Sequence, residues 1–243
     1  MSCIFSIEGN IGSGKSTLVK ILKEQLFTAN GKKIIFLQEP VDEWESIKDE
    51  SGESILEKFY SNQQKYAFSF QMMAYISRIS LLKNTIKKNP SSIIITERSV
   101  YTDKEVFAKM LYNDGKIEKV NYDIYLKWFD EFTKDIHING IIYVQATPMI
   151  SSQRVKKRDR VGEIIPLTYL IKCHKYYESW LENQPNIYVF DGNKEFESIN
   201  KATDEINIDN RLNHLIKHIV QETKFKSPFK PSDYDSILAT FGC

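Results

Sequence analysis

One short segment near the start of the chain combines glycines, a lysine and a serine at a spacing suited to phosphate binding. Residues 9–16 read Gly-Asn-Ile-Gly-Ser-Gly-Lys-Ser and fit the P-loop pattern G-x-x-x-x-G-K-[ST]. The apolar run Ile4–Ile7 precedes them and a helical spacing of apolar residues follows, which is the strand, loop and helix context that the pattern needs. Backbone amides, a lysine and a hydroxyl suit a nucleoside triphosphate and its Mg²⁺. The residues expected to bind it are Gly9, Asn10, Ile11, Gly12, Ser13, Gly14, Lys15, Ser16 and Thr17.

Two carboxylates and an arginine follow the second and third apolar runs. Ile34–Leu37 leads to Glu39, and Ile93–Ile95 leads to Glu97 and Arg98. In an open parallel sheet the ligand lies beyond the carboxyl ends of the strands, so we expect these side chains around the phosphates. Glu39 is the candidate base for a hydroxyl acceptor, Glu97 is expected to support Mg²⁺, and Arg98 to neutralise the transferred group. The alternatives are an ordinary carboxylate at a helix start for Glu39 and a structural pair for Glu97 and Arg98.

A cluster of cations follows the fourth apolar run. Arg154 and Arg158 are four residues apart and share one face if this stretch is helical. Arginine makes charge-assisted, bidentate contacts to phosphate, so we predict an arginine-rich lid over the phosphates; a solvated helix face is the alternative. The cluster comprises Arg154, Lys156, Lys157, Arg158 and Arg160.

Aromatic residues lie on segments near the predicted strand ends. A heterocyclic ring needs flat side chains to stack on and a planar amide that both donates and accepts hydrogen bonds. Gln71, inside an apolar helical stretch, is the candidate for such an amide. Core packing is the alternative for most of the aromatic residues. They are Trp44, Tyr60, Phe68, Phe70 and Phe107.

Apolar, β-branched runs alternate with stretches of helical spacing along the whole chain. This alternation indicates an α/β fold with a five-stranded parallel sheet and helices on both faces. We predict a single domain over residues 1–220, and a tail, 221–243, to which no role is assigned. The predicted strands are Cys3–Ile7, Lys33–Gln38, Ser92–Thr96, Ile141–Gln145 and Ile187–Phe190; the predicted helices are 15–29, 53–88, 103–136, 149–159, 167–182 and 211–220, with a break near 113–115 and a loop at 193–210.

Composition argues against two classes of protein, general nucleic-acid binders and membrane-spanning proteins. The 33 Lys and Arg nearly balance the 32 Asp and Glu, which argues against a general nucleic-acid binder. No apolar run is long enough to cross a membrane. The chain reaches its first predicted strand within three residues, so we expect no targeting segment and a cytoplasmic location; a trimmed organellar precursor is the alternative.

Taken together, these motifs resemble the deoxynucleoside kinases of the deoxycytidine, deoxyguanosine and deoxyadenosine kinase type. The matches keep the family order over residues 1–200, and the resemblance implies the P-loop kinase fold. The lid is one residue shorter than in the family between Glu163 and Pro166. The matching pieces are residues 8–17, Glu39-Pro-Val-Asp-Glu-Trp44, Phe70-Gln71, Glu97-Arg-Ser-Val-Tyr-Thr-Asp103, the arginine cluster and Pro166-Leu167.

The resemblance implies a role for each matched position. Glu39 and Arg98 would act at the 5′-hydroxyl of the deoxyribose, and Lys15 at the phosphates. Gln71 would read the base edge between walls formed by Trp44, Phe70 and Phe107. The remaining matches are Tyr60 and Glu163 at the 3′-hydroxyl, Arg154, Arg158 and Arg160 on the phosphates, and Lys194, Glu195 and Phe196 at the donor base.

Three positions bear on the choice of nucleoside. Ala74, Arg78 and Asp103 match the combination of the deoxycytidine and purine deoxynucleoside kinases. A small residue leaves room, and an Arg–Asp pair adds polar contacts beside the base. The expected preference is therefore for cytosine or purine deoxynucleosides over thymidine.

The predicted function is ATP- and Mg²⁺-dependent phosphorylation of a deoxynucleoside 5′-hydroxyl in nucleotide salvage. One alternative is a thymidylate-type nucleoside monophosphate kinase, but Glu39, Asp42 and Glu43 would repel an acceptor phosphate. A P-loop switch protein is the other alternative, although Asn193–Phe196 lacks the Asp of the guanine-reading N-K-x-D motif. The two long helical stretches exceed what one sheet face needs, and together with the resemblance they favour a homodimer.

Overall fold

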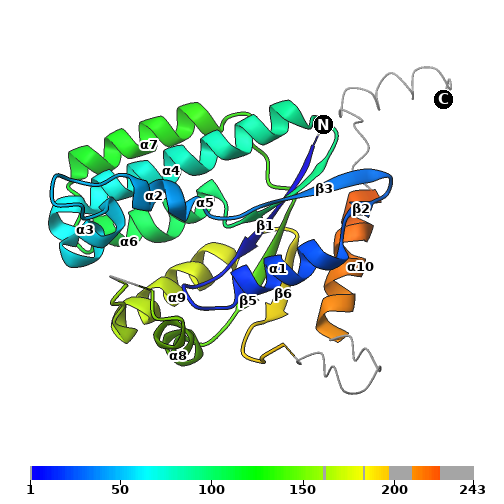
Figure 1. Cartoon of the computed structure of the whole chain (residues 1–243). Coiled ribbons are helices and arrows are strands. Elements are labelled where there is room, and N and C mark those ends of the chain that lie inside the picture. Colours follow the sequence, from blue (N-terminus) through cyan, green and yellow to red (C-terminus); the bar gives the residue numbers. More distant parts are fainter. Residues whose placement is uncertain (1, 161–162, 183, 197–209, 225–243) are drawn as a thin grey trace.

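The protein is described by a computed structural model that covers residues 2–160, 163–182, 184–196 and 210–224. The tail beyond Lys224 and most of the predicted loop 193–210 lie outside these ranges. The centre of the fold is one curled sheet with strand order β2-β3-β4-β1-β5-β6 (Figure 1). Its strands are β1 (Cys3–Glu8), β2 (Thr28–Ala29), β3 (Lys32–Leu37), β4 (Ile93–Glu97), β5 (Gly140–Gln145) and β6 (Ile187–Asp191).

Helices connect and cover the strands. The predicted stretch 53–88 divides at Asn62, which caps the second of two helices. The predicted stretch 103–136 begins as a π-helix and is interrupted after Asn113, near the expected break. The helices are α1 (Lys15–Gln25), α2 (Val41–Ser46), α3 (Ile55–Ser61), α4 (Gln63–Lys88), α5 (Val100–Thr102), the π-helix η1 (Asp103–Ala108), α6 (Lys109–Asn113), α7 (Lys119–Thr133), α8 (Pro148–Arg158), α9 (Leu167–Leu181) and α10 (Asn210–Lys224).

The sheet differs from the prediction in its number of strands. Strands β3, β4, β1, β5 and β6 pair in parallel and occupy the predicted runs, but β2 is a sixth, antiparallel strand. The predicted helix 15–29 ends at Gln25, and Leu26 is already extended. Asn30 and Gly31 then adopt φ of 49° and 72°, the left-handed pair that a two-residue hairpin turn requires. The expectation of five strands is therefore wrong. The helical spacing predicts one helix over 15–29, but the last two of these residues form β2, which leads into the Asn-Gly turn.

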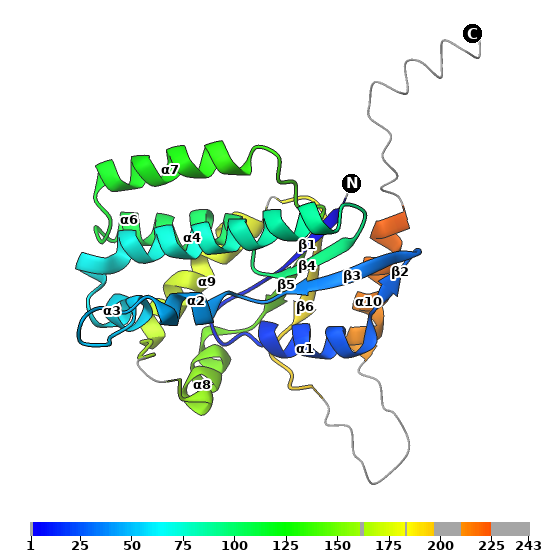
Figure 2. The same cartoon turned by 45° about the horizontal axis from the view of Figure 1, so that its top comes forward.

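Two layers of helices bury the two faces of the sheet. Helices α1 and α10 cover one face, where Leu18 and Leu215 pack with Phe5 of β1. On the other face Tyr75 of α4 and Phe129 of α7 pack with Ile4 of β1, as alternation along a strand requires. Figures 1 and 2 show α4 and α7 running side by side on the outside of this layer. None of the helices in the described ranges has the length and hydropathy to cross a bilayer.

Candidate active site

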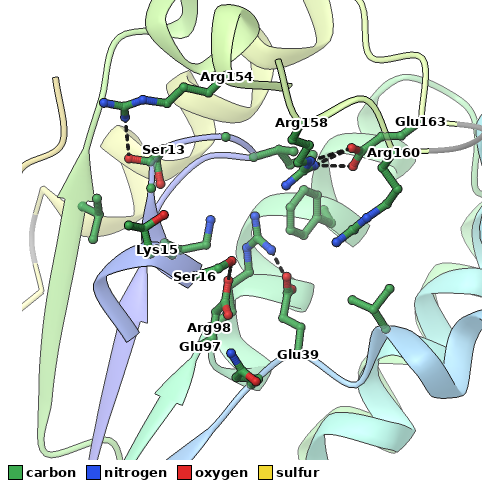
Figure 3. A pocket seen from close by; sticks show the side chains of 18 of the residues that line it. Ser13, Lys15, Ser16, Glu39, Glu97, Arg98, Arg154, Arg158, Arg160 and Glu163 are labelled. Carbon is green, nitrogen blue, oxygen red and sulfur yellow. Dashed lines mark hydrogen bonds and ion pairs between the residues drawn. The ribbon is translucent and has the colours of Figure 1, made fainter. Parts of the chain in front are cut away.

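A cavity of about 780 Å³ opens at the carboxyl ends of the parallel strands, between the P-loop, α4, η1 and the lid (Figure 3). The structure brings nearly all the predicted site residues to this cavity. The exceptions are Gly9 and Asn10, which are buried at the start of the P-loop, Phe68, which packs in the apolar core, and Lys156. The predicted residues that line it are Ile11, Gly12, Ser13, Gly14, Lys15, Ser16, Thr17, Glu39, Trp44, Tyr60, Phe70, Gln71, Ala74, Arg78, Glu97, Arg98, Asp103, Phe107, Arg154, Lys157, Arg158, Arg160, Glu163, Lys194, Glu195 and Phe196.

The P-loop connects β1 to α1 and wraps around the Lys15 ammonium. The Lys15 Nζ donates to the Asn10 carbonyl oxygen at 2.7 Å. Burial and the nearby Arg98 charge lower the pKa of Lys15 to about 7, so the ammonium lacks a full counter-charge and suits an incoming anion. Gly12 has φ +77°, and a Cβ there would lie 2.4 Å from the Ser151 carbonyl oxygen of α8. The loop therefore touches the helix that carries the lid.

Ser16 and Glu97 place two oxygen ligands at the floor of the cavity. The Ser16 Oγ donates to Glu97 Oε1 at 2.5 Å, and this pair joins the start of α1 to the end of β4. Hydroxyl, carboxylate and phosphate oxygens are ligands that suit Mg²⁺. Among the described residues there is no cluster of three or more His, Cys, Asp or Glu able to hold a metal. The pair thus fits Mg²⁺ that also takes ligands from phosphates and water.

Glu39 lies between two arginines at the end of β3. Its Oε1 accepts from Arg98 Nη1 at 2.6 Å and from Arg78 Nη2 at 3.1 Å. Burial opposes ionisation of Glu39, but the charges of Arg98, Arg78 and Lys15 outweigh it and lower its pKa to about 2. The carboxylate is therefore ionised and fixed in place, facing the P-loop (Figure 3).

Arg98 has an unusual backbone that turns its side chain into the cavity. It adopts φ +59° directly after β4, a conformation that is strained for a residue with a long side chain. Three neighbours hold its guanidinium, since Nε donates to the Tyr177 hydroxyl at 3.1 Å, Nη2 to the Gly9 carbonyl at 3.4 Å and Nη1 to Glu39. The guanidinium also lies 5.3 Å from the Phe107 ring centroid. This geometry fixes the cation beside Glu39.

Arg78 and Asp103 extend the charged wall toward the base side of the cavity. Arg78 Nε donates to Asp103 Oδ2 at 2.9 Å, and Nη1 to the Glu97 carbonyl at 3.0 Å. Burial raises the pKa of Asp103 against the opposing pull of Arg78. We call Arg98, Glu39, Arg78 and Asp103 the inner ion network, because each carboxylate bridges or ends a continuous chain of ion pairs.

The wall opposite the phosphates is aromatic. Phe70 stacks on Phe59 with centroids 4.6 Å apart and meets Trp44 edge to face at 5.5 Å. Gln71 is buried, and its Oε1 has no hydrogen-bond partner among the residues that the structure describes. A buried acceptor without a partner is costly, and this one is free to accept from a polar ring edge in the cavity. Ala74 lies one helical turn further along α4, and its small side chain leaves room in the cavity at this wall.

The lid arginines, Arg154, Arg158 and Arg160, are held in different ways. Arg154 Nη1 donates to the backbone carbonyls of Ser13 and Gly192 at 3.0 and 2.6 Å. Arg158 forms a two-armed pair with Glu163, whose Oε1 also accepts from the Tyr60 hydroxyl at 3.4 Å. Arg160 points toward the cavity in Figure 3. Arg154 and Arg158 both lie on α8, four residues apart as expected, but they bind two different sets of partners.

Three residues that hold the site escaped the sequence analysis. Glu8 is fully buried and accepts from the Ser99 amide at 2.9 Å and from the Thr102 hydroxyl, which fixes the turn that follows Arg98. Tyr177 binds Arg98, and Arg211 of α10 binds the loop that begins at Asp191. Glu8 is visible in the sequence as an acidic residue directly ahead of the P-loop. No local pattern marks Tyr177 or Arg211, because their partners are distant in sequence.

The fold and the site define a P-loop phosphotransferase with a buried, carboxylate-bearing acceptor pocket. The deoxynucleoside kinase family model matches residues 5–217. A probable deoxycytidine kinase of fowlpox virus (strain NVSL) is 38% identical over 180 residues, which cover 72% of this chain and 70% of the relative. Human deoxycytidine kinase is 35% identical over 192 residues, covering 72% and 74%. The mitochondrial deoxyguanosine kinase of Xenopus laevis is 32% identical over 232 residues, covering 83% and 86%.

The chain belongs to the deoxynucleoside kinase family. It is therefore a kinase that uses a nucleoside triphosphate as phosphate donor and a deoxynucleoside as acceptor. The resemblance inferred from the motifs is confirmed, and so is the mixed α/β fold in its main architecture.

Proposed function

We propose that the protein transfers the γ-phosphoryl group of ATP to the 5′-hydroxyl of a deoxynucleoside in nucleotide salvage, with deoxycytidine or a purine deoxynucleoside preferred over thymidine. The observation that carries this proposal is the Glu39 carboxylate, bound by Arg98 and Arg78 and facing the P-loop across the cavity. An ionised carboxylate at this place suits an acceptor that is a neutral hydroxyl and would repel one that carries a phosphate.

In this proposal Glu39 orients the 5′-hydroxyl and takes its proton as the phosphoryl group arrives. A pKa of about 2 makes Glu39 a weak base, but the transition state of phosphoryl transfer is loose, so positioning contributes more than early proton removal. Arg98 and Lys15 stabilise negative charge on the transferred group from either side. Ser16 and Glu97 would hold Mg²⁺, which neutralises charge on the donor phosphates when bound.

The preference for the base is assigned to the aromatic wall and to the far end of the inner ion network. Gln71 supplies the acceptor without a partner, and Arg78 and Asp103 supply a donor and an acceptor beside it. A cytosine or adenine edge carries an amino group that such acceptors can bind, and a purine carries N7 for the arginine. Tyr60 and Glu163 bind the 3′-hydroxyl, and the lid arginines bind the phosphates.

An acceptor panel tests this function. The purified protein is supplied with ATP and Mg²⁺ and offered the four deoxynucleosides and their 5′-monophosphates, with ADP release as the readout. We expect phosphorylation of deoxycytidine or the purine deoxynucleosides, weaker use of thymidine and no use of monophosphates. Turnover of monophosphates alone, or no acceptor-dependent ADP release, would overturn the proposal. Exchange of ATP for other triphosphates in the same assay ranks the donors.

Base choice has its own test in the Arg78–Asp103 pair. Replacing both residues, as Arg78→Met with Asp103→Ala, should change the ratio of thymidine to deoxycytidine or deoxyadenosine use. An unchanged ratio would show that the pair does not select the base, but it would not contradict the proposed kinase activity.

We further propose a homodimer formed through α4 and α7. Helix α7 runs along the outside of the molecule beside α4 (Figure 2). One side of α4 lines the cavity, but both helices also carry large apolar side chains exposed to solvent, which are typical of an interaction surface. Light scattering of the wild type and of Trp128→Glu should give a dimer and a monomer respectively. The exposed side chains are Ile76, Val120, Ile124, Trp128 and Phe132.

A further inference from the structure

Helix α10 places one charged side chain against the loop that lines the far side of the cavity. Residues 191–196, here called the donor loop, begin at the last residue of β6 and lie beyond the P-loop. Gly192 is so close to the P-loop that a Cβ would be 3.0 Å from the Ser13 carbonyl oxygen. Several members of the donor loop line the cavity: Gly192, Lys194, Glu195 and Phe196. A triphosphate seated on the P-loop therefore extends its nucleoside toward this loop.

The half-buried Arg211 guanidinium binds the donor loop through its backbone. Nη1 donates to the Asp191 carbonyl at 2.7 Å and to the Lys194 carbonyl at 3.3 Å, and Nη2 donates to the Glu195 carbonyl at 3.0 Å. The same guanidinium lies 5.2 Å from the Phe190 ring centroid and 5.4 Å from that of Phe196. One side chain thus holds both the turn of the loop and the ring at its end.

Arg211 is not what attaches α10 to the protein. Leu212, Leu215 and Ile219 are buried in the core that also contains Leu18 and Leu22 of α1. The opposite end of the helix is held by Asn30, whose Nδ2 donates to the Val220 carbonyl at 2.8 Å and to the Thr223 hydroxyl at 2.6 Å. The hydrogen bonds of Arg211 named above are therefore directed to the loop and are additional to the packing of the helix.

We infer that Arg211 is a positioning residue for the donor base, which fixes the donor loop in the conformation that receives it. A planar guanidinium can donate to several carbonyls and stack on a ring at once, whereas a lysine ammonium cannot reproduce that geometry. A loop that is ordered before binding loses less conformational entropy when the ligand arrives. Removing these contacts weakens binding of a donor that has a base and leaves binding of the phosphates alone unchanged.

Calorimetric titration of wild type and Arg211→Lys with ATP and with inorganic tripolyphosphate, both with Mg²⁺, tests this inference. We expect the Kd for ATP to rise about tenfold in Arg211→Lys, because the positive charge is kept but the hydrogen-bond fork is lost. The Kd for tripolyphosphate should stay within about twofold of wild type. In steady-state assays the KM for ATP should rise, with kcat and the deoxynucleoside KM unchanged.

Asn30→Gly is the matched control, because it removes the contacts at the other end of α10 and glycine tolerates the left-handed backbone there. It should leave the ATP Kd within about twofold of wild type. An unchanged ATP Kd in Arg211→Lys, equal weakening of ATP and tripolyphosphate, or an equal loss in Asn30→Gly would overturn the inference. Arg211→Gln gives a second variant if the lysine variant fails to fold.

The inference rests on the proposed function only in taking ATP as the donor, and the two fail differently. If no deoxynucleoside is phosphorylated but the two titrations diverge as expected, the proposed function falls and the role of Arg211 stands. If phosphorylation proceeds and ATP binds Arg211→Lys as tightly as wild type, only the role of Arg211 falls.

Discussion

The inner ion network and the lid hold the same kinds of side chain in opposite ways. In the network, the side chains of Arg98, Arg78 and Asp103 are only 6%, 7% and 2% exposed, and Glu39 is 16% exposed. In the lid, Arg158 is 35% exposed and pairs with Glu163, five residues away, whose own side chain is 4% exposed. The network is built on two strand ends, a long helix and the start of η1, whereas the lid pair joins the last residue of α8 to the segment after that helix.

This difference matches the two substrates. A deoxynucleoside hydroxyl is small and uncharged, so it cannot reorganise a charged site and must meet groups that are already aligned. A triphosphate brings enough charge to replace Glu163 as the partner of Arg158, whose guanidinium is partly exposed to water. A buried network fixes geometry, although its desolvation makes it a poor source of stability. The protein therefore has a rigid acceptor side and an exchangeable donor side.

The comparison is tested most strongly at Glu39. We expect Glu39→Gln to lower kcat by about 10²–10⁴-fold, because the amide keeps the shape of the side chain but cannot orient and deprotonate the hydroxyl as a carboxylate does. The KM for ATP should change little, since the donor binds on the other side of the cavity. Glu43→Gln, at an exposed position of α2, is the control. Near-wild-type turnover of Glu39→Gln would show that Glu39 is not the group that accepts the proton of the hydroxyl.

The loss of unfolding free energy should also be larger for a variant in the inner ion network than for one in the lid. Asp103→Asn removes a buried partner of Arg78 and should lower the free energy of unfolding by about 3 kcal/mol. Arg158→Gln removes the partly exposed arginine of the lid pair, and the glutamine amide can still donate to Glu163, so it should lower the free energy of unfolding by about 1 kcal/mol or less. Urea unfolding of both variants at neutral pH measures the difference. Equal losses would show that the lid is as rigidly held as the network.

The parts of the site that could be predicted from sequence are those attached to regular elements by local pattern. The P-loop has a spacing rule, and Glu39, Glu97 and Arg98 directly follow apolar strands, so parallel-sheet geometry brings them together. Their presence around one cavity needs only strand order, and the strand runs were correctly located.

What escaped prediction depends on contacts between distant segments. Tyr177 lies 79 residues from Arg98, and Glu8 lies 91 residues from Ser99, so no spacing rule connects them. Strand β2 was missed for a different reason, because the Asn30-Gly31 turn signal was present but the helical pattern before it was extended too far. The π-helix that begins at Asp103 is set by packing and has no sequence signature of its own.

Acid should weaken the network through Glu39. Its folded pKa of about 2 lies below the ordinary value of 4.5, so its stabilising contribution is complete above about pH 4.5 and is lost as the pH falls toward 2. Between about pH 6 and about pH 3, wild type should lose about 2 kcal/mol more unfolding free energy than Glu39→Gln, which has no proton to take up. Urea unfolding at the two pH values measures this. Parallel loss in both proteins would mean that Glu39 is not held by the arginines in solution.

The finest test of a rigid acceptor side is a single hydroxyl that never reaches the cavity. Tyr177 is fully buried and accepts a hydrogen bond from Arg98 Nε, and burial raises the pKa of its hydroxyl, so it stays neutral. We expect Tyr177→Phe to lower kcat by about tenfold, because Arg98 loses one of the contacts that orient its guanidinium. The KM for ATP should not change.

Tyr143 provides a matched control for that hydroxyl. Its ring stacks near Tyr177 with centroids 6.1 Å apart, but its hydroxyl donates to Glu178 at 2.6 Å and has no contact with Arg98 in the described structure. Tyr143→Phe should therefore keep kcat within about twofold of wild type. In an Arg98→Lys background, Tyr177→Phe should cause little further loss, since residues that act through one another are not additive. Equal losses from the two hydroxyls, or full additivity with Arg98→Lys, would mean that packing around α9, and not the orientation of Arg98, limits the rate.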